Sequence, residues 1–319
     1  MGLLEKIGVV DNREGWPWTE ETDHDVYQGY NKHEWPKISI ITPSYNQGKF
    51  IEETIRSVLL QNYPNLEYII IDGGSTDDTV EIIQKYERWI TYWISEKDDG
   101  QSHAINKGYR IATGEIINWL NSDDLLTQNS LFLIASCFLV EPRIDWVTGF
   151  RVVRNVNKIG LKFENHWEHR WVYYLFGIPD FPQEATFLRK RLVAKIGEID
   201  TSLEYVMDVD FYYRMLAESN SGGFLRAVLT IMNEYNEQKT LRLDNRKDSE
   251  YSFVVKKHEK RFITKLFSRI LYTRFYDIFI KLIEMLYTRK AKKRFHIFIF
   301  SSRTVKVEKK AFQSNTYNP

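Results

Sequence analysis

The sequence predicts an α/β protein with a mostly parallel sheet flanked by helices. Between residues 37 and 124, short runs of β-branched and aliphatic residues alternate with stretches whose apolar residues recur at helical spacing. This alternation is typical of parallel strands joined by helical crossovers. Polar residues also cluster directly after three of the predicted strands. In parallel sheets this edge carries the ligand site, so the same pattern predicts where a site lies.

The first two strand–helix units fall between residues 37 and 86. Lys37–Thr42 is a β-branched run that ends at Pro43, and apolar residues then recur at helical spacing over residues 50–59. Leu66–Ile71 repeats the strand pattern, and residues 77–86 repeat the helix pattern. We therefore expect two parallel strands, each followed by a helix.

Further elements continue the alternation. Trp89–Ile94 and Ile116–Leu120 predict the third and fourth strands, and Ser102–Ala112 predicts the helix between them. Beyond residue 145 the alternation weakens, although Trp146–Arg151 still predicts a strand and Asp208–Ala217 a helix. The α/β pattern is therefore clearest in the first half of the chain.

We divide the chain into three parts. Residues 1–36 are polar and rich in Trp and Pro, which predicts an irregular arm that lays aromatic anchors on a domain. Residues 37–248 are the predicted α/β domain, and residues 249–319 are a basic and aromatic extension that we expect to be helical. Basic residues between Lys256 and Arg294 alternate with aromatic and aliphatic ones. Two interpretations stay open for them: peripheral binding to an anionic membrane surface, or packing on the domain.

Composition excludes some classes of protein. The formal net charge is +1, so we expect no nucleic-acid partner. The single cysteine, Cys137, lies in an apolar run and cannot form an internal disulfide, which fits a reducing compartment. Met1–Val10 is too short and polar for a signal peptide, and no stretch approaches the ~18 apolar residues that a spanning helix needs. We therefore expect a cytoplasmic location.

The strongest chemical feature is the run Asn121–Asp124 at the end of an apolar strand. Adjacent carboxylates, here Asp123 and Asp124, repel each other and need a cation or hydrogen-bond donors nearby. Mg²⁺ is commonly held by one or two carboxylates together with substrate phosphates. The alternative is a polar turn that caps a helix starting near Thr127.

A second acidic motif follows the second predicted strand. Asp72 ends that strand, and Gly73 and Gly74 allow a backbone to approach a ligand closely. Neither a Walker sequence nor GxGxxG is present, so a phosphate loop of those types is not predicted. Asp72 is a candidate acceptor of hydrogen bonds from a base or ribose; the alternative is a tight turn in which Asp77 caps the next helix.

A third acidic motif contains Asp208 and Asp210 at the start of a predicted helix. Residues two positions apart do not share a helix face. We expect one carboxylate to point into a cleft, where it is a candidate general base, and the other to point onto the surface. The alternative is another helix cap.

Taken in order, these motifs resemble glycosyltransferase family 2, whose members have the glycosyltransferase-A fold. The resemblance covers residues 37–220 and looks like the branch found in bacterial surface-polysaccharide synthesis. It is carried by the segments KISIITPSYNQGKFIEETIRSVLLQNYPNLEYIIIDGGSTDDT, SEKDDGQSHAINKGYRIATGEIINWLNSDD, QEATFLRK and MDVDFYYRM.

The resemblance implies a role for each matching residue. Asp124 matches the metal ligand and Asp208 the catalytic base. The residues that match the donor nucleotide site are Pro43, Ser44, Tyr45, Asp72, Asp99, Gly100, Lys107 and Asp123, and those that match the acceptor side are Gln183 and Glu184. Two positions depart from the pattern, because many relatives have Asp where this chain has Gly73 and Glu where it has Met207.

By resemblance, the chain is expected to be an inverting glycosyltransferase that uses Mn²⁺ or Mg²⁺. The donor would be a nucleoside-diphosphate sugar, with a UDP-sugar expected, and the acceptor a hydroxyl of a glycan or lipid-linked molecule. One alternative is a nucleotidyltransferase that makes sugar nucleotides, although Ser44–Gln47 lacks the basic, glycine-rich loop expected after its first strand. Another is a binding homologue without catalysis, against which the intact Asp72, Asp124 and Asp208 argue.

Overall fold

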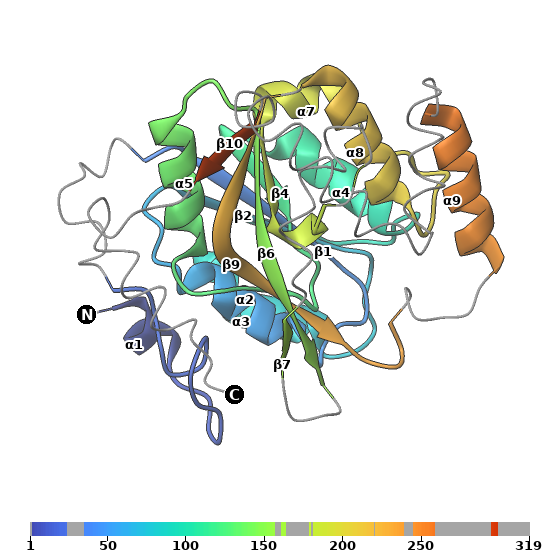
Figure 1. Cartoon of the computed structure of the whole chain (residues 1–319). Helices are drawn as coiled ribbons and strands as arrows, with labels where there is room; N and C mark the ends of the chain where they lie inside the picture. Colours follow the sequence, from blue (N-terminus) through green and yellow to red (C-terminus); the bar gives the residue numbers. More distant parts are fainter. Residues whose placement is uncertain are drawn as a thin grey trace.

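The computed structural model describes residues 2–23, 35–156, 161–163, 179, 181–219, 221–238, 245–258 and 295–298. These residues form a mixed ten-stranded sheet with helices on both faces (Figure 1). The strands are β1 Ile38–Ser44, β2 Leu66–Asp72, β3 Tyr92–Ser95, β4 Ile116–Trp119, β5 Leu125–Leu126, β6 Trp146–Asn155, β7 Leu161–Phe163, β8 Thr186–Arg189, β9 Gly222–Glu234 and β10 Phe295–Phe298. The helices are α1 Leu3–Ile7, α2 Ile51–Leu59, α3 Thr79–Tyr86, α4 Gln101–Ile111, α5 Ser130–Val140, α7 Lys190–Ile196, α8 Met207–Glu218 and α9 Asn245–His258, with short 3₁₀ turns η3 Glu87–Trp89 and η4 Gln183–Ala185.

The predicted parallel strands lie side by side. The sheet order is β10-β9-β6-β8-β4-β1-β2-β3, with β5 paired to β9 and β7 to β6. Strands β4, β1, β2 and β3 are parallel, whereas β8 runs against both β4 and β6. Ser44 lies in register with Asp72, and Asp72 with Ser95. The carboxyl ends of three neighbouring strands therefore share one edge, which confirms the predicted α/β sheet and brings the polar residues after β1 and β2 to the same edge.

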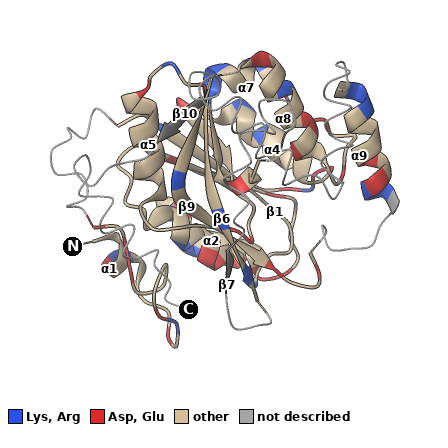
Figure 2. Cartoon of the chain, viewed as in Figure 1, with Lys and Arg blue, Asp and Glu red and all other residues tan. Residues whose placement is uncertain are grey.

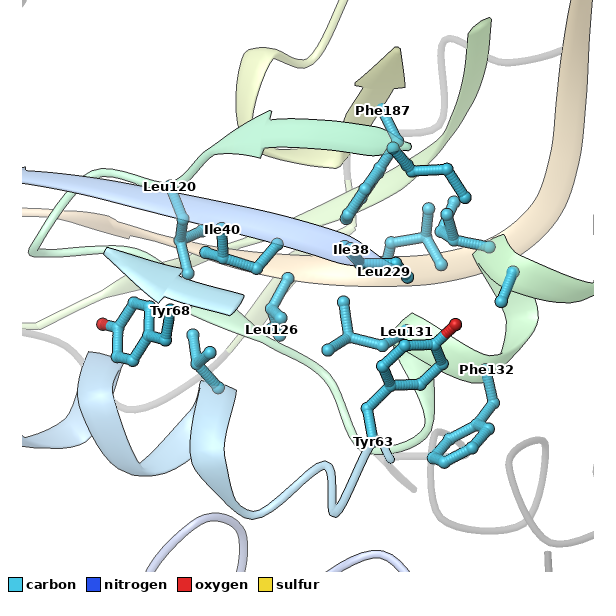
Figure 3. Close-up of a cluster of buried hydrophobic side chains, with 14 of the residues drawn as sticks. Ile38, Ile40, Tyr63, Tyr68, Leu120, Leu126, Leu131, Phe132, Phe187 and Leu229 are labelled. Carbon is cyan, nitrogen blue, oxygen red and sulfur yellow. The ribbon is translucent and has the colours of Figure 1, made fainter. Parts of the chain in front are cut away.

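Two hydrophobic cores cover the two faces of the sheet, because successive side chains of a strand point to opposite faces. On β1, Ile38 and Ile40 pack with α2, α3 and α5, whereas Ile41 packs with α4, α7 and α8. Figure 3 shows the first core, in which Leu131 and Phe132 of α5 approach the strands. Every residue of β1 is buried. Strands covered on both faces are apolar throughout, which is why the sequence predicted them clearly.

The N-terminal arm is joined to the sheet domain by a buried arginine. Arg56 of α2 is fully buried, and its guanidinium donates to the carbonyls of Pro17 (3.0 Å) and Trp18 (2.9 Å). The Trp18 side chain is itself buried, and Trp16 donates its indole N–H to the carbonyl of Leu126 (2.8 Å). The arm thereby supplies hydrogen bonds to a charged group that would be costly to bury alone.

The C-terminal part differs from the expected division at residue 248. Helix α9 runs through that position, and Val254 from its second half is fully buried in the core that contains α8. Acidic and basic side chains both occur along α9 (Figure 2). Because Val254 is its buried apolar residue, the helix shows little of the apolar periodicity by which a helix is predicted from sequence. Strand β10 lies in the extension that we expected to be helical, and it pairs with β9.

The basic segment Lys256–Arg294 falls mostly outside the described residues, which include it only up to His258 and resume at residue 295. Within the described ranges, no helix is long and apolar enough to cross a membrane.

Candidate active site

A cavity of about 790 Å³ lies where β1, β2 and β4 end. Many of the residues predicted from the sequence line it: Pro43, Ser44, Tyr45, Asp123, Asp124, Gln183, Glu184 and Asp208. Other lining residues were not predicted, among them Arg151, Tyr205, Met232, Tyr235 and Gln238. Three predicted residues, Asp72, Asp99 and Lys107, lie nearby but outside the lining. The size is that of a pocket for a small molecule or cofactor.

The loop after β1 presents Tyr45 at the mouth of the cavity, with 59% of its surface exposed. Asn46 follows in the left-handed backbone region, with φ of 53°, which asparagine tolerates better than most residues. The loop is held by the turn after β2, because Ser75 accepts a hydrogen bond from the Asn46 amide (2.7 Å) and Asp77 accepts one from the Gly48 amide (2.9 Å). This leaves the Tyr45 ring available for a planar ligand.

Asp72 is fully buried and organises the turn that follows it. Its carboxylate accepts hydrogen bonds from the Gly74 amide (3.1 Å), the Ser75 amide (2.9 Å) and the Ser95 hydroxyl (2.6 Å). The neighbouring Gly73 lines the cavity in its place. A Cβ at Gly73 would lie 3.0 Å from the Asp98 carboxylate, so an Asp at this position would crowd a second acid.

The loop before α4 reaches the cavity through one predicted residue, Gly100, and through Asp98 beside the predicted Asp99. Asp98 and Gly100 line it, whereas the Asp99 side chain is exposed at 93% and points to His103. Lys107 forms an ion pair with Glu96 at 2.6 Å and does not line the cavity. The predicted loop therefore borders the cavity, and Gly100, with φ of 105°, forms the turn between Asp98 and α4.

Asp124 is the most strongly perturbed acid of the site. Its side chain is buried, its Oδ2 accepts a hydrogen bond from Asn121 (3.2 Å), and its Oδ1 has no hydrogen-bond partner. Burial raises the pKa of Asp124 well above its usual range, and the charges of Asp123 and Glu184 raise it further. A buried carboxylate oxygen without a partner, facing a cavity among acids, fits a divalent cation.

Asp123 accepts hydrogen bonds from the C-terminal end of β9 and from the loop that follows it. Its Oδ2 accepts hydrogen bonds from the hydroxyl of Tyr235 (2.8 Å) and the amide of Gln238 (3.4 Å). Its carbonyl accepts one from the side chain of Asn233 (2.6 Å). Burial raises the pKa of Asp123. These partners follow it by 110 or more residues and belong to no local motif, so no sequence pattern pointed to them.

Gln183 and Glu184 lie on η4, beside the loop that contains Asp124. The side-chain oxygen of Gln183 accepts a hydrogen bond from Asn121 (3.1 Å). Glu184 is buried and forms an ion pair with Arg151 of β6 at 3.5 Å. Gln183 is therefore linked to Asp124 through Asn121, and Glu184 is close enough for its charge to raise the pKa of Asp124.

The two aspartates at the start of α8 face different surroundings. Asp208 lines the cavity, and burial raises its pKa. Asp210 is fully buried, which corrects the expectation that the second acid would lie on the surface. It binds Arg214 (2.9 Å), Lys257 (2.9 Å) and His258 (2.8 Å), and the last two residues belong to α9. Although its burial opposes ionisation, these partners hold the pKa of Asp210 below its usual value.

Within the described part of the chain, no group of three or more His, Cys, Asp or Glu side chains is arranged to hold a metal ion. A metal at Asp124 would therefore take most of its ligands from a bound substrate, which is common for Mg²⁺ in phosphate-handling sites.

Comparison with known proteins places this chain in a family. Residues 39–197 match the model described as Glycosyl transferase family 2. Two uncharacterized glycosyltransferases of Mycobacterium tuberculosis are 32% identical to the chain over 181 residues, which cover 56% of this chain and 68% of theirs. A putative teichuronic acid biosynthesis glycosyltransferase of Bacillus subtilis is 41% identical over 99 residues, or 30% of this chain and 39% of that protein.

A solved structure shows the same fold. The crystal structure of S. aureus TarS 1-349 in complex with UDP-GlcNAc has a TM-score of 0.57 and 19% identity, and the match covers 81% of this chain and 73% of that one. The expected glycosyltransferase-A architecture is thereby confirmed. On the family match and the M. tuberculosis relatives together, the chain belongs to glycosyltransferase family 2.

Proposed function

We propose that this glycosyltransferase is an inverting, metal-dependent enzyme. It would move a sugar from a nucleoside-diphosphate sugar, with UDP as the expected nucleotide, to a hydroxyl of a glycan or lipid-linked acceptor. The observation that carries the proposal is that one cavity contains two acids suited to different tasks. Asp124 has a buried oxygen without a partner, and Asp208 has a pKa raised by burial.

The cation would be held by Asp124, with Asp123 and Asn121 beside it. When bound, Mn²⁺ or Mg²⁺ would neutralise the charge that develops on the leaving diphosphate. Asp123 would lie toward the ribose and sugar, while Tyr45 offers its exposed ring to the base. The UDP-GlcNAc bound by TarS supports a UDP-sugar, since that protein shares the fold.

Asp208 would act as the general base. A carboxylate with a raised pKa is a stronger base than an exposed one, and Asp208 also reaches the cavity that would hold the acceptor hydroxyl. The acceptor O–H proton would pass to Asp208 as the acceptor oxygen bonds to the anomeric carbon. The bond from that carbon to the diphosphate would break on the opposite side, so a single displacement inverts the configuration.

The acceptor is proposed to be part of a surface glycan, which the teichuronic acid relative supports. A lipid-linked acceptor would explain the basic, aromatic composition of Lys256–Arg294 as a peripheral attachment to the inner, anionic face of the cytoplasmic membrane. Lys257 already pairs with Asp210 (2.9 Å), so the attachment would depend on other basic residues of the segment.

A donor screen tests the proposal. Purified protein is heated with UDP-, GDP-, dTDP- and CMP-sugars, each with Mn²⁺ and each with EDTA. We expect a UDP-sugar to raise the melting temperature in the presence of Mn²⁺, because a ligand that binds only the folded state stabilises it. Stabilisation by no nucleotide sugar would contradict the proposed donor site, and equal stabilisation with EDTA would contradict its dependence on a metal.

A further inference from the structure

The loop that follows β9 forms hydrogen bonds to Asp123, one of the two adjacent acids of the site. The hydroxyl of Tyr235 donates to Oδ2 of Asp123 at 2.8 Å, and the side-chain amide of Gln238 donates to the same oxygen at 3.4 Å. Gln238 also donates to the carbonyl of Asn233, and Asn233 donates to the carbonyl of Asp123 (2.6 Å). Both the backbone and the side chain of Asp123 are thus held from one direction.

The ring of Tyr235 is fixed by a separate contact. It stacks on Phe50, next to the start of α2, with 4.5 Å between ring centroids and 29° between ring planes. This stack packs the Tyr235 side chain against Phe50, with its hydroxyl 2.8 Å from Oδ2 of Asp123. Tyr235 also lines the cavity, as do Gln238 and Asp123, so the contact lies at the edge of the ligand site.

These hydrogen bonds reduce the cost of placing two carboxylates next to each other. Asp123 and Asp124 are adjacent carboxylates, and their negative charges would repel each other. The hydroxyl of Tyr235 and the amide of Gln238 are neutral donors that stabilise the charge of Asp123. They offset the repulsion without adding a cation that would compete with a metal ion at Asp124. Burial and the charge of Asp123 raise the pKa of Tyr235 above its usual value, so its hydroxyl stays protonated and remains a donor.

We propose that Tyr235, assisted by Gln238, is a positioning residue for the donor: it orients the Asp123 carboxylate toward the bound nucleotide sugar. This inference rests on the proposed function, because it requires that Asp123 contacts the donor. It assigns a role in donor binding to the end of β9, which lies beyond the residues 39–197 matched by the family model.

A mutant cycle on nucleotide affinity tests the inference. The dissociation constants of UDP, GDP, dTDP and CDP, each with Mn²⁺, are measured by calorimetry for the wild type, and the nucleotide bound most tightly is the probe. Tyr235→Phe keeps the ring and removes only the hydroxyl. We expect about tenfold weaker binding, the size of a lost hydrogen bond to a charged group, in a protein that remains folded by circular dichroism. Tyr92→Phe, which alters an exposed tyrosine on β3, is the matched control and should bind like the wild type.

The cycle is completed in the Asp123→Ala background. If Tyr235 acts through Asp123, Tyr235→Phe should cause no further loss there. Gln238→Ala gives a second arm, with about threefold weaker binding in the wild-type background and none in Asp123→Ala. Equal losses in both backgrounds, or unchanged affinity in Tyr235→Phe, would overturn the inference alone. If the wild type binds none of the four nucleotides, the proposed function falls, and the inference falls with it.

Discussion

At the scale of single residues, two aspartates separated by one position, Asp208 and Asp210, lie in different surroundings. Asp208 lines the cavity, whereas Asp210 is enclosed by Arg214, Lys257 and His258. The sequence predicted that they would diverge, since residues two positions apart cannot share a helix face. It could not predict that Asp210 would be buried, because two of its partners come from α9, 47 and 48 residues later.

The first prediction concerns Asp208→Asn. An amide cannot take a proton from the acceptor, so we expect transfer to slow by about 10²–10⁴-fold while the affinity for the donor is kept. Turnover and donor binding by calorimetry measure the two effects separately. Asp210→Asn is the matched control and should instead lower the free energy of unfolding by about 1.5–3 kcal/mol, because it removes the charge of a buried carboxylate that binds Arg214, Lys257 and His258. A collapse of donor affinity in Asp208→Asn would assign this acid to the nucleotide site.

The second prediction is the pH dependence of transfer. Burial raises the pKa of Asp208 above its ordinary value of 3.8, and the base works only when it is deprotonated. The rate should therefore be constant at higher pH and fall as the pH drops through the raised pKa. A profile of kcat/KM against pH measures this, and a rate that is constant down to pH 4 would contradict Asp208 as the base.

At the scale of elements, the strands were predictable and the contacts between distant loops were not. Strands β1 and β2 are covered on both faces, and their continuous apolar runs gave a clear signal. The parallel arrangement then fixed which loops meet. The sequence did not contain the orientation of side chains within each loop. Of the predicted Asp99, Gly100 and Lys107, only Gly100 lines the cavity, together with Asp98. Tyr235 was missed because it reaches Asp123 only through the pairing of β9 with β6 and β5.

The third prediction tests how the strands are joined beneath the site. Glu67 of β2 is buried and binds Lys37 (2.6 Å), the Ser39 hydroxyl (2.5 Å) and the Thr113 amide (2.7 Å). Burial alone would raise its pKa, but these hydrogen bonds outweigh burial and lower the pKa of Glu67 to about 2. Glu67→Gln should therefore lower the free energy of unfolding at pH 7 by about 1.5–3 kcal/mol.

The sign of the pH effect follows from the lowered pKa. The stability contributed by ionised Glu67 is complete above the ordinary value of 4.5 and is lost as the pH falls from there through about 2. Urea unfolding of the wild type and Glu67→Gln should differ by a constant amount from pH 7 to pH 5 and converge below pH 4.5. A difference that stays constant at pH 3 would show that ionisation of Glu67 is not what stabilises this junction.

At the scale of the whole molecule, the cavity is built from segments that lie far apart in the sequence. The loops after β1 and β4 supply Tyr45 and Asp124, whereas β9 and its loop supply Tyr235. Helix α9 then braces the loop before α8, since Glu250 accepts hydrogen bonds from the amides of Glu204 (3.0 Å) and Tyr205 (2.8 Å). Residues on both sides of position 248 therefore support the same site.

The fourth prediction concerns attachment to membranes. If the segment Lys256–Arg294 binds the acceptor's membrane, the full chain should sediment with vesicles that contain anionic lipid at low salt and be released as salt rises, because exposed charges are screened within ~10 Å at 0.1 M. Vesicles of neutral lipid are the control. Protein that stays in the supernatant with anionic vesicles at low salt would favour the alternative, a segment packed on the domain.

The most direct test of metal-assisted transfer is the release of nucleoside diphosphate from a panel of nucleotide sugars, compared between the wild type and Asp124→Asn. We expect the wild type to release UDP from a UDP-sugar when Mn²⁺ or Mg²⁺ is present and to stop when EDTA is added. Asp124→Asn should remain folded by circular dichroism and release almost none, because the buried oxygen that would hold the cation has lost its charge. Equal release by both proteins, with the same response to the metal, would contradict the assignment of Asp124 as the metal ligand and the central claim with it.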